Sequence, residues 1–113
     1  MELRAACIQA RKAAPMVDFY RKIFGHEPEV DGGVDFQFRA ERLTVYQMGE
    51  GEGPETHGGA FIYEVTDVDA EYERLAALGF RGLNPPTDKP WGVRSFMIEG
   101  PGGNLVSLTK RIR

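Results

Sequence analysis

Few side chains of this 113-residue chain have a type and a setting that favour chemistry. One histidine, His26, directly follows a predicted helix end at Gly25, and the other, His57, precedes two glycines. A cation is favoured at the C-terminal end of a helix, so we interpret His26 as a helix-end residue rather than a base. Gly58-Gly59 favours a loop at His57. Neither histidine is therefore assigned a catalytic role.

Cys7 and Glu64 are the remaining candidates for nucleophilic attack or proton transfer. A nucleophilic thiol needs a base or a cation beside it to lower its pKa, and the sequence assigns none to Cys7. We therefore interpret Cys7 as a small buried residue. Glu64 could serve as a general base, but no partner acid or electrophile is visible in the pattern. Gln9 could hydrogen-bond a ligand or line a rim.

Aromatic side chains provide a second type of candidate. Phe36 and Phe38 share one face of a predicted strand, because strand side chains alternate. Phe96 belongs to the matching strand of the second half, and Tyr46 and Trp91 lie beside the expected edges of a cleft. Such rings either line an apolar ligand site or belong to the core.

Two helices must position these residues. The first is predicted to begin at Pro15 and to end at Gly25. The second begins at the capping sequence Thr66-Asp67-Val68-Asp69 and ends at Gly79. Their apolar faces follow helical spacing and comprise Met16, Phe19, Tyr20, Ile23 and Phe24 in the first helix and Val68, Tyr72, Leu75 and Ala76 in the second.

Short strands account for most of the remaining chain. The predicted strands are Leu3 to Ala10, Glu27 to Asp31, Val34 to Arg39, Leu43 to Met48, Ala60 to Val65, Phe80 to Leu83, Val93 to Ile98 and Leu105 to Thr109. The order is strand, helix, three strands, twice over. The sequence thus predicts an α+β fold in which two βαβββ modules, 1–48 and 60–113, flank a glycine-rich linker, 49–59, within one domain.

Composition excludes several classes of protein. The chain has 14 basic and 17 acidic residues, a net charge of −3, and 42% hydrophobic residues. Scattered arginines in a mildly acidic chain argue against a nucleic-acid partner. No apolar run has the length of a membrane span, and no secretory signal is visible at the start. A lone cysteine is compatible with a reducing compartment, so we expect a cytoplasmic protein.

Five stretches together resemble the vicinal oxygen chelate superfamily, which includes glyoxalase I, extradiol dioxygenases, fosfomycin resistance enzymes and bleomycin resistance proteins. They are Phe19-Tyr20 with Ile23-Phe24-Gly25, Tyr63 to Asp69, Leu78-Gly79-Phe80, Pro90 to Arg94, and Gly100 to Val106. Together they span nearly the whole chain. The resemblance implies a glyoxalase/bleomycin resistance fold, with the modules forming an eight-stranded, cupped mixed sheet.

The resemblance also implies where a metal would be held. Enzymes of this superfamily bind a divalent ion through His, Glu or Gln side chains, and the matching positions here are Ala5, Ala60 and Ser107. The fourth lies among Val45, Tyr46 and Gln47. Alanine has no donor atom and a neutral serine is a poor substitute for a carboxylate or an imidazole. We therefore expect no metal and no other cofactor.

Trp91 resembles the tryptophan that walls the ligand groove of bleomycin resistance proteins. The preferred hypothesis is a metal-free protein that sequesters a flat or partly aromatic compound, as in antibiotic resistance, without turnover. The expected ligand-binding residues are Trp91, Phe38, Tyr46, Arg94, Gln9 and Ser107. For Arg94, a structural salt bridge is the alternative. The net charge mildly favours a cationic ligand.

Two other hypotheses stay open. One is an enzyme, either a metal-dependent lyase or isomerase of glyoxalase type or a dioxygenase, which would require ligands outside the aligned positions. The other is a regulatory or immunity-type protein whose cleft binds a macromolecule. A homodimer is expected in every case, because one helix cannot cover both faces of a sheet and related small proteins pair their chains with two-fold symmetry.

Overall fold

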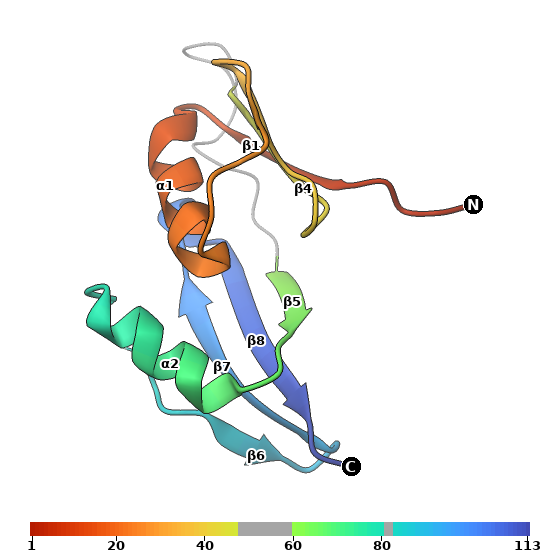
Figure 1. Cartoon of the computed structure of the whole chain (residues 1–113), viewed down its shortest axis with the longest axis vertical. Coiled ribbons are helices and arrows are strands. Elements are labelled where there is room, and N and C mark those ends of the chain that lie inside the picture. Colours follow the sequence, from red (N-terminus) through yellow and green to blue (C-terminus); the bar gives the residue numbers. More distant parts are fainter. Residues whose placement is uncertain (48–59, 81–82) are drawn as a thin grey trace. The chain divides into compact units, whose positions relative to one another are not determined.

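Two α-helices and eight strands form in the part of the chain that the computed structural model describes, residues 1–47, 60–80 and 83–113. The elements are β1 (Ala6–Ala10), α1 (Ala13–Phe24), β2 (Val30–Asp31), β3 (Asp35–Phe38), β4 (Leu43–Gln47), β5 (Ala60–Glu64), α2 (Val68–Ala77), β6 (Thr87–Lys89), β7 (Val93–Glu99), the 3-10 helix η1 (Pro101–Gly103) and β8 (Leu105–Arg111) (Figure 1). The predicted linker and His57 lie outside the described residues.

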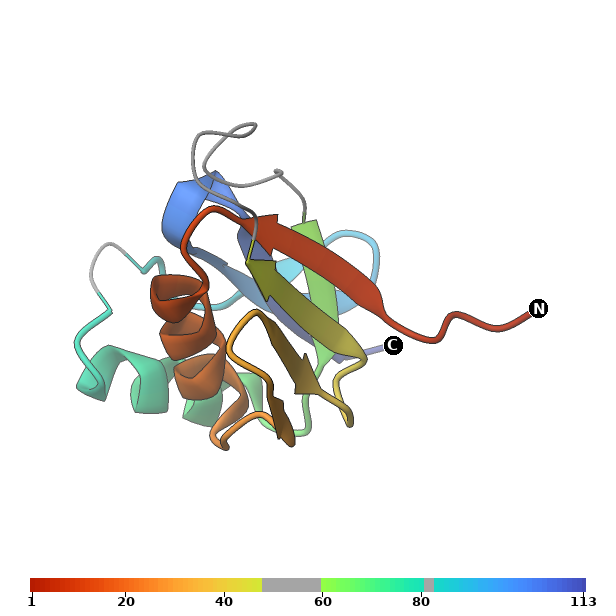
Figure 2. The ribbon, with the colours of Figure 1, turned by 90° about the horizontal axis from the view of Figure 1, so that it is seen from above.

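The strands form two four-stranded mixed sheets, in the orders β1-β4-β3-β2 and β5-β8-β7-β6. In each sheet the first and last strands of a module are parallel neighbours, and the other pairs are antiparallel. Figure 2 shows β1, in red, beside the olive strand β4. The prediction of two βαβββ modules with a glyoxalase-type fold is confirmed. The eight expected strands are divided into two sheets of four, because the hydrogen-bonded ladders stay within each module.

The chain divides into two compact units, Met1–Gly58 with Pro101–Gly103, and Gly59–Gly100 with Asn104–Arg113. In the first unit α1 packs on β1 and β4. In the second unit α2 packs on β7 and β8. Each unit therefore has one sheet face that its own helix covers and one face that this helix leaves open.

Local sequence signals fix the ends of both helices. Helix α1 begins before Pro15, at Ala13, whose backbone N–H donates to Oε1 of Gln47 at 3.0 Å. It ends at Gly25, which adopts the left-handed conformation with φ 80° that glycine tolerates best. Helix α2 has Asp67 as its N-cap, which accepts a hydrogen bond from the backbone N–H of Ala70 at 3.0 Å.

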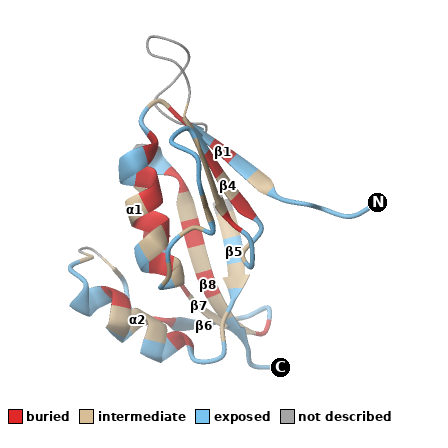
Figure 3. Ribbon diagram, turned by 45° about the horizontal axis from the view of Figure 1, so that its top comes forward, coloured by how far each residue is buried: buried red, intermediate tan, exposed pale blue. Residues whose placement is uncertain are grey.

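Each helix-covered sheet face forms a core. The first unit buries Met16, Tyr20, Phe38, Leu43 and Val45, and the second buries Val68, Leu75, Phe96, Ile98 and Val106. Figure 3 shows the resulting alternation of buried and half-buried residues along β8. The residues predicted to form the apolar faces of the two helices are buried or half-buried, except that Ala76 is exposed. No helix in the described residues is both long and apolar enough to cross a bilayer.

The sequence pattern predicted a strand over Phe80 to Leu83, of which residues 81 and 82 lie outside the described residues and Phe80 and Leu83 are not in a strand. The sixth strand that the structure describes is Thr87–Lys89. It pairs with β7 through Thr87–Ser95, Asp88–Arg94 and Lys89–Val93. This three-residue edge strand has no apolar alternation, so its pairing with β7 rather than its own sequence makes it a strand.

Candidate functional site

The open face of the second sheet carries the side chains that alternate with the core residues. Ser107 on the central strand β8 lies opposite Ile62 of β5 and Met97 of β7. These two apolar neighbours are 74% and 54% exposed. Large apolar side chains at this exposure, on the two strands that flank β8, form an apolar surface that a ligand or a partner could cover.

This face is hollowed. A hollow of about 860 Å³ is lined by the apolar side chains of Ile62, Trp91, Val93 and Met97, together with Ser95, Ser107 and Thr109 from β7 and β8. Volumes of this order accommodate a drug-sized molecule. Hydroxyl groups within an apolar lining suit a ligand that is mostly apolar and carries a few hydrogen-bonding groups.

The loop between β6 and β7 places Trp91 at this hollow. Gly92 has φ 94°, a backbone conformation that favours glycine, and its N–H donates to the carbonyl of Lys89 at 3.1 Å. The carbonyl of Gly92 accepts from the N–H of Ile112 at 2.9 Å. The N–H and the carbonyl of Gly92 are thus both hydrogen-bonded, which fixes the turn, while the indole of Trp91 remains 73% exposed.

Lys89 is the charged residue among those that line the hollow. Its Nζ donates to the hydroxyl of Thr87 at 2.7 Å on the same strand. No carboxylate belongs to the lining that the structure describes. The local charge is therefore positive, in contrast to the net charge of the chain, and does not favour a cationic ligand at this place.

The six residues expected to bind a ligand are divided between the two units, with Gln9, Phe38 and Tyr46 in the first and Trp91, Arg94 and Ser107 in the second. Trp91 and Ser107 line the hollow of the second sheet. Gln9 and Tyr46 are register partners on adjacent strands of the first sheet, and both are exposed on its open face. These four residues remain candidates for ligand contact.

Phe38 and Arg94 lie on the other sides of their sheets. Phe38 is 0% exposed and packs edge-on against Phe24 with ring centroids 5.0 Å apart, so it belongs to the core of the first unit. Arg94 binds Asp69 of α2 and Asp88 of β6, at 2.9 and 3.0 Å. These carboxylates raise its pKa, Asp69 most strongly. A structural salt bridge is the role that these contacts support.

Cys7 was wrongly expected to be buried. It is exposed on the open face of the first sheet, opposite Thr44 in the register. Partial burial of the thiol and, secondarily, the carboxylate of Asp35 raise its pKa. A raised pKa lowers the fraction of Cys7 that is ionised to the thiolate at neutral pH, so this environment does not activate Cys7 as a nucleophile.

His26 has a structural role at the end of α1. Its Nε2 lies 2.9 Å from the carboxylate of Glu41, and its Nδ1 lies 2.8 Å from the carbonyl of Glu27. The hydrogen bond with Glu41, followed by that with Glu27, raises the pKa of His26. Glu64 is exposed and is the register partner of Thr109. Neither residue forms part of a catalytic pair within the described chain.

The aligned metal positions do not form a donor set for a divalent ion. Of the three residues among which the fourth position lies, Val45 is buried, Gln47 accepts a hydrogen bond from the backbone N–H of Ala13, and Tyr46 is exposed on the open face. Tyr46 is therefore the residue of the three that suits the fourth position best. The four residues are then Ala5, Ala60, Ser107 and Tyr46, which supply two neutral hydroxyl groups and no carboxylate or imidazole. The described residues also contain no group of three His, Cys, Asp or Glu side chains that could hold a metal.

Sequence reasoning missed Ile62, Met97 and Lys89 as lining residues. Ile62 and Met97 are conspicuous only once β5 and β7 are placed on the two sides of Ser107, because an isolated apolar residue in a strand is normally part of the core. Lys89 lies in the strand that the pattern did not predict. Strand register would have been needed to find all three.

Comparisons with known proteins agree with this architecture. Residues 3–108 match the Glyoxalase/Bleomycin resistance protein/Dioxygenase superfamily. An uncharacterised protein of Mycobacterium bovis is 31% identical over 118 aligned positions, which cover 89% of this chain and 78% of that protein.

Two solved structures show the same fold. One, described as a conserved domain protein, has a TM-score of 0.84 and 24% identity, and the match covers 98% of this chain and 99% of that chain. The other, a bleomycin-binding protein complexed with bleomycin, has a TM-score of 0.75 and 15% identity over the same shares of the two chains. At these identities the likeness establishes the fold alone.

Proposed function

This chain belongs to the Glyoxalase/Bleomycin resistance protein/Dioxygenase superfamily, and from that membership we propose that it binds and sequesters a flat or partly aromatic small molecule without chemical turnover. The observation that carries this proposal is the hollow on the second sheet, where Trp91, Ile62 and Met97 are exposed around Ser107. One solved structure with this fold is a bleomycin-binding protein complexed with bleomycin, and an antibiotic ligand is compatible with a hollow of this kind.

The physical basis is the removal of apolar surface from water. The indole of Trp91 offers a flat face, and Ile62 and Met97 offer aliphatic surface on the two sides of β8. A planar compound placed against them gains hydrophobic and dispersion energy, at roughly 25 cal/mol for each Å² of apolar surface buried. Ser107 and Thr109 can then orient the ligand through hydrogen bonds.

The chain's lone tryptophan gives a direct assay. We expect Trp91 emission to shift to shorter wavelength, with saturation, when bleomycin or another antibiotic with a planar ring system is added to the full chain. Met97→Ser should weaken that binding about tenfold, because it removes apolar contact on the floor of the hollow without changing the reporter. Leu78→Ser is the matched control, since Leu78 is exposed in the same unit but does not line the hollow.

Equal weakening by both variants, or a panel of planar compounds that gives no saturable shift, would contradict the proposal. The rival function, a metal-dependent glyoxalase-type lyase, isomerase or dioxygenase, predicts a different result. Dialysis against nickel or zinc should then leave about one tightly bound ion per chain. Because Ala5, Ala60 and Ser107 do not supply the required donors, we expect no such stoichiometric binding.

A further inference from the structure

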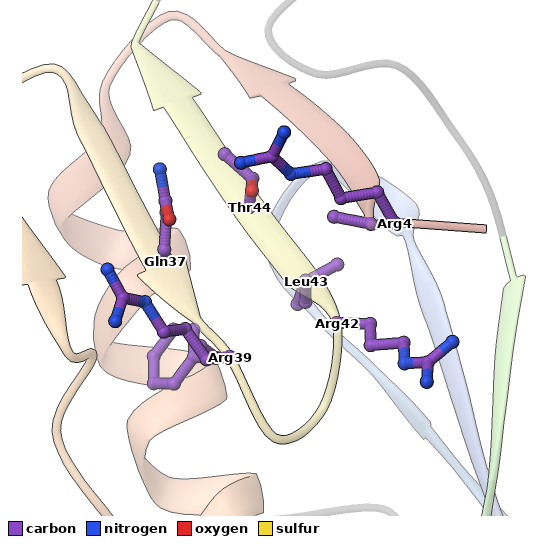
Figure 4. A pocket seen from close by; sticks show the side chains of 8 residues that line it. Arg4, Gln37, Arg39, Arg42, Leu43 and Thr44 are labelled. Carbon is purple, nitrogen blue, oxygen red and sulfur yellow. The ribbon is translucent and has the colours of Figure 1, made fainter. Parts of the chain in front are cut away.

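A second hollow, of about 520 Å³, lies on the first unit where β3 turns into β4 and where the segment before β1 runs alongside. Three of its lining residues are arginines, Arg4, Arg39 and Arg42, and Gln37 and Thr44 contribute polar groups from β3 and β4 (Figure 4). Positive charge is therefore concentrated at one end of a sheet in a chain whose net charge is −3.

Two hydrogen bonds hold the segment before β1 beside the turn between β3 and β4. The turn contains Arg42 with φ 54°, and its carbonyl accepts a hydrogen bond from the N–H of Ala6 at 2.8 Å. The guanidinium of Arg42 donates to the carbonyl of Leu3 at 3.0 Å. These two bonds hold the segment that carries Arg4 against the turn that follows Arg39. Figure 4 shows Arg4 extending in the direction of Thr44, while Arg42 points away from it.

Arg4 and Arg39 differ from the paired arginines of this protein. Arg21, Arg74 and Arg94 each form an ion pair with a carboxylate. Within the described residues, the guanidinium groups of Arg4 and Arg39 have neither an ion pair nor a hydrogen bond.

Among the described residues, the carboxylates near this hollow form no ion pair with those two guanidinium groups. Glu29 accepts from the backbone N–H of Arg39 at 3.4 Å, and Asp35 accepts from Nε2 of Gln37 at 2.9 Å. No carboxylate is among the described residues that line the hollow. Neighbouring like charges repel each other, and an added anion would relieve that repulsion.

We propose that this hollow binds the oxyanion group of a small molecule, a phosphate or a carboxylate, through Arg4 and Arg39. A planar guanidinium presents parallel N–H donors that match either oxyanion, and the hydroxyl of Thr44 supplies a further donor on the same surface. The site is separate in its residues from the hollow of the second sheet, so its test does not depend on the proposed sequestration of a planar compound.

The test titrates the full chain with inorganic phosphate and, separately, with succinate, at constant ionic strength, and follows binding by calorimetry. We expect saturable binding of at least one probe. Arg4→Gln and Arg39→Gln should each weaken it at least tenfold, and Arg39→Lys should lie between Arg39→Gln and the unaltered chain because it keeps the charge and loses the planar fork. Binding of phosphate alone identifies a phosphate ligand, and binding of succinate alone identifies a carboxylate ligand.

Arg111→Gln is the matched control, because Arg111 is an exposed arginine at the end of β8 and does not line this hollow. It should leave the affinity unchanged. Equal weakening by Arg111→Gln would show general charge screening and overturn the site, as would the absence of saturation with both probes. Since Arg4 and Arg39 are exposed, their variants should keep the circular dichroism of the parent chain.

Discussion

The guanidinium of Arg94 forms a two-pronged ion pair with the carboxylate of Asp69, with Nη2–Oδ1 at 2.9 Å and Nε–Oδ2 at 3.0 Å. This pair connects the middle of the second sheet to the first turn of α2, and Asp88 of β6 accepts from the remaining Nη1 at 3.0 Å. One side chain thus links α2, β6 and β7, three elements that follow one another along the chain.

The first prediction concerns the pH at which this link acts. Arg94 lowers the pKa of Asp69, chiefly by hydrogen bonding to its carboxylate. Since the folded pKa lies below the unfolded one, the pair contributes stability above the unfolded pKa and loses it as pH falls through the folded value. Arg94→Gln should therefore lower the urea midpoint slightly at neutral pH, with the difference disappearing in acid. A midpoint difference that persists in acid would contradict this account.

Trp91→Ala should cost little stability. The indole is 73% exposed, so its truncation removes little packing and should lower the free energy of unfolding by less than ~1 kcal/mol. Truncation of a fully buried aromatic costs about 3–5 kcal/mol. Urea unfolding followed by circular dichroism measures the difference. A loss in the larger range would show that Trp91 is a core residue and would remove it from the ligand site.

The contact between His26 and Glu41 should affect stability with a pH dependence opposite to that of the Arg94–Asp69 pair. The hydrogen bond to Glu41 raises the pKa of His26 in the folded chain. The pair therefore contributes its full stability below the ordinary histidine pKa and loses it as pH rises through the raised value. Glu41→Gln should move the pKa of His26 back toward the ordinary value, which an NMR titration of the imidazole measures. An unchanged titration would mean that the contact does not persist in solution.

Cys7 should react slowly with thiol reagents at neutral pH, despite its exposure. Its pKa is raised by partial burial and by Asp35, so the reactive thiolate is scarce. Asp35→Asn should speed modification by a disulfide reagent severalfold and shift the pH–rate profile to lower pH. Asp31→Asn, a change at an exposed aspartate of β2, is the control and should leave the rate unchanged.

The helices and most strands could be predicted because their signals are local. Gly25 ends α1 and Asp67 caps α2, as the sequence indicated. The sixth strand could not be predicted, because Thr87–Lys89 is a strand only through its pairing with β7. Local chemistry determines where a helix begins and ends, whereas a short edge strand depends on a neighbour that is distant in the sequence.

The candidate sites were only partly predictable for a related reason. Alternation showed that Phe36 and Phe38 share a face, but it did not show which face the helix covers. Phe38 lies on the face that α1 covers and is therefore part of the core. Arg94 lies on the face that α2 covers, where it binds Asp69. The place of Trp91 at the hollow could be predicted, because the position of a loop residue between proline and glycine does not depend on the alternation of side chains in a strand. The arginine-lined hollow required the pairing of β1 with β4 and therefore had no signal in the sequence.

The parallel pairing of the first and last strands in each module has a consequence for biosynthesis. Strand β8 lies between β5 and β7, so the second sheet lacks an inner strand until the ribosome has made Leu105–Arg111. Until then, β5 and β7 have unpaired backbone groups that can bind other chains. The second module should consequently acquire protease resistance only late in translation, whereas the sheet of the first module is complete once β4 has emerged.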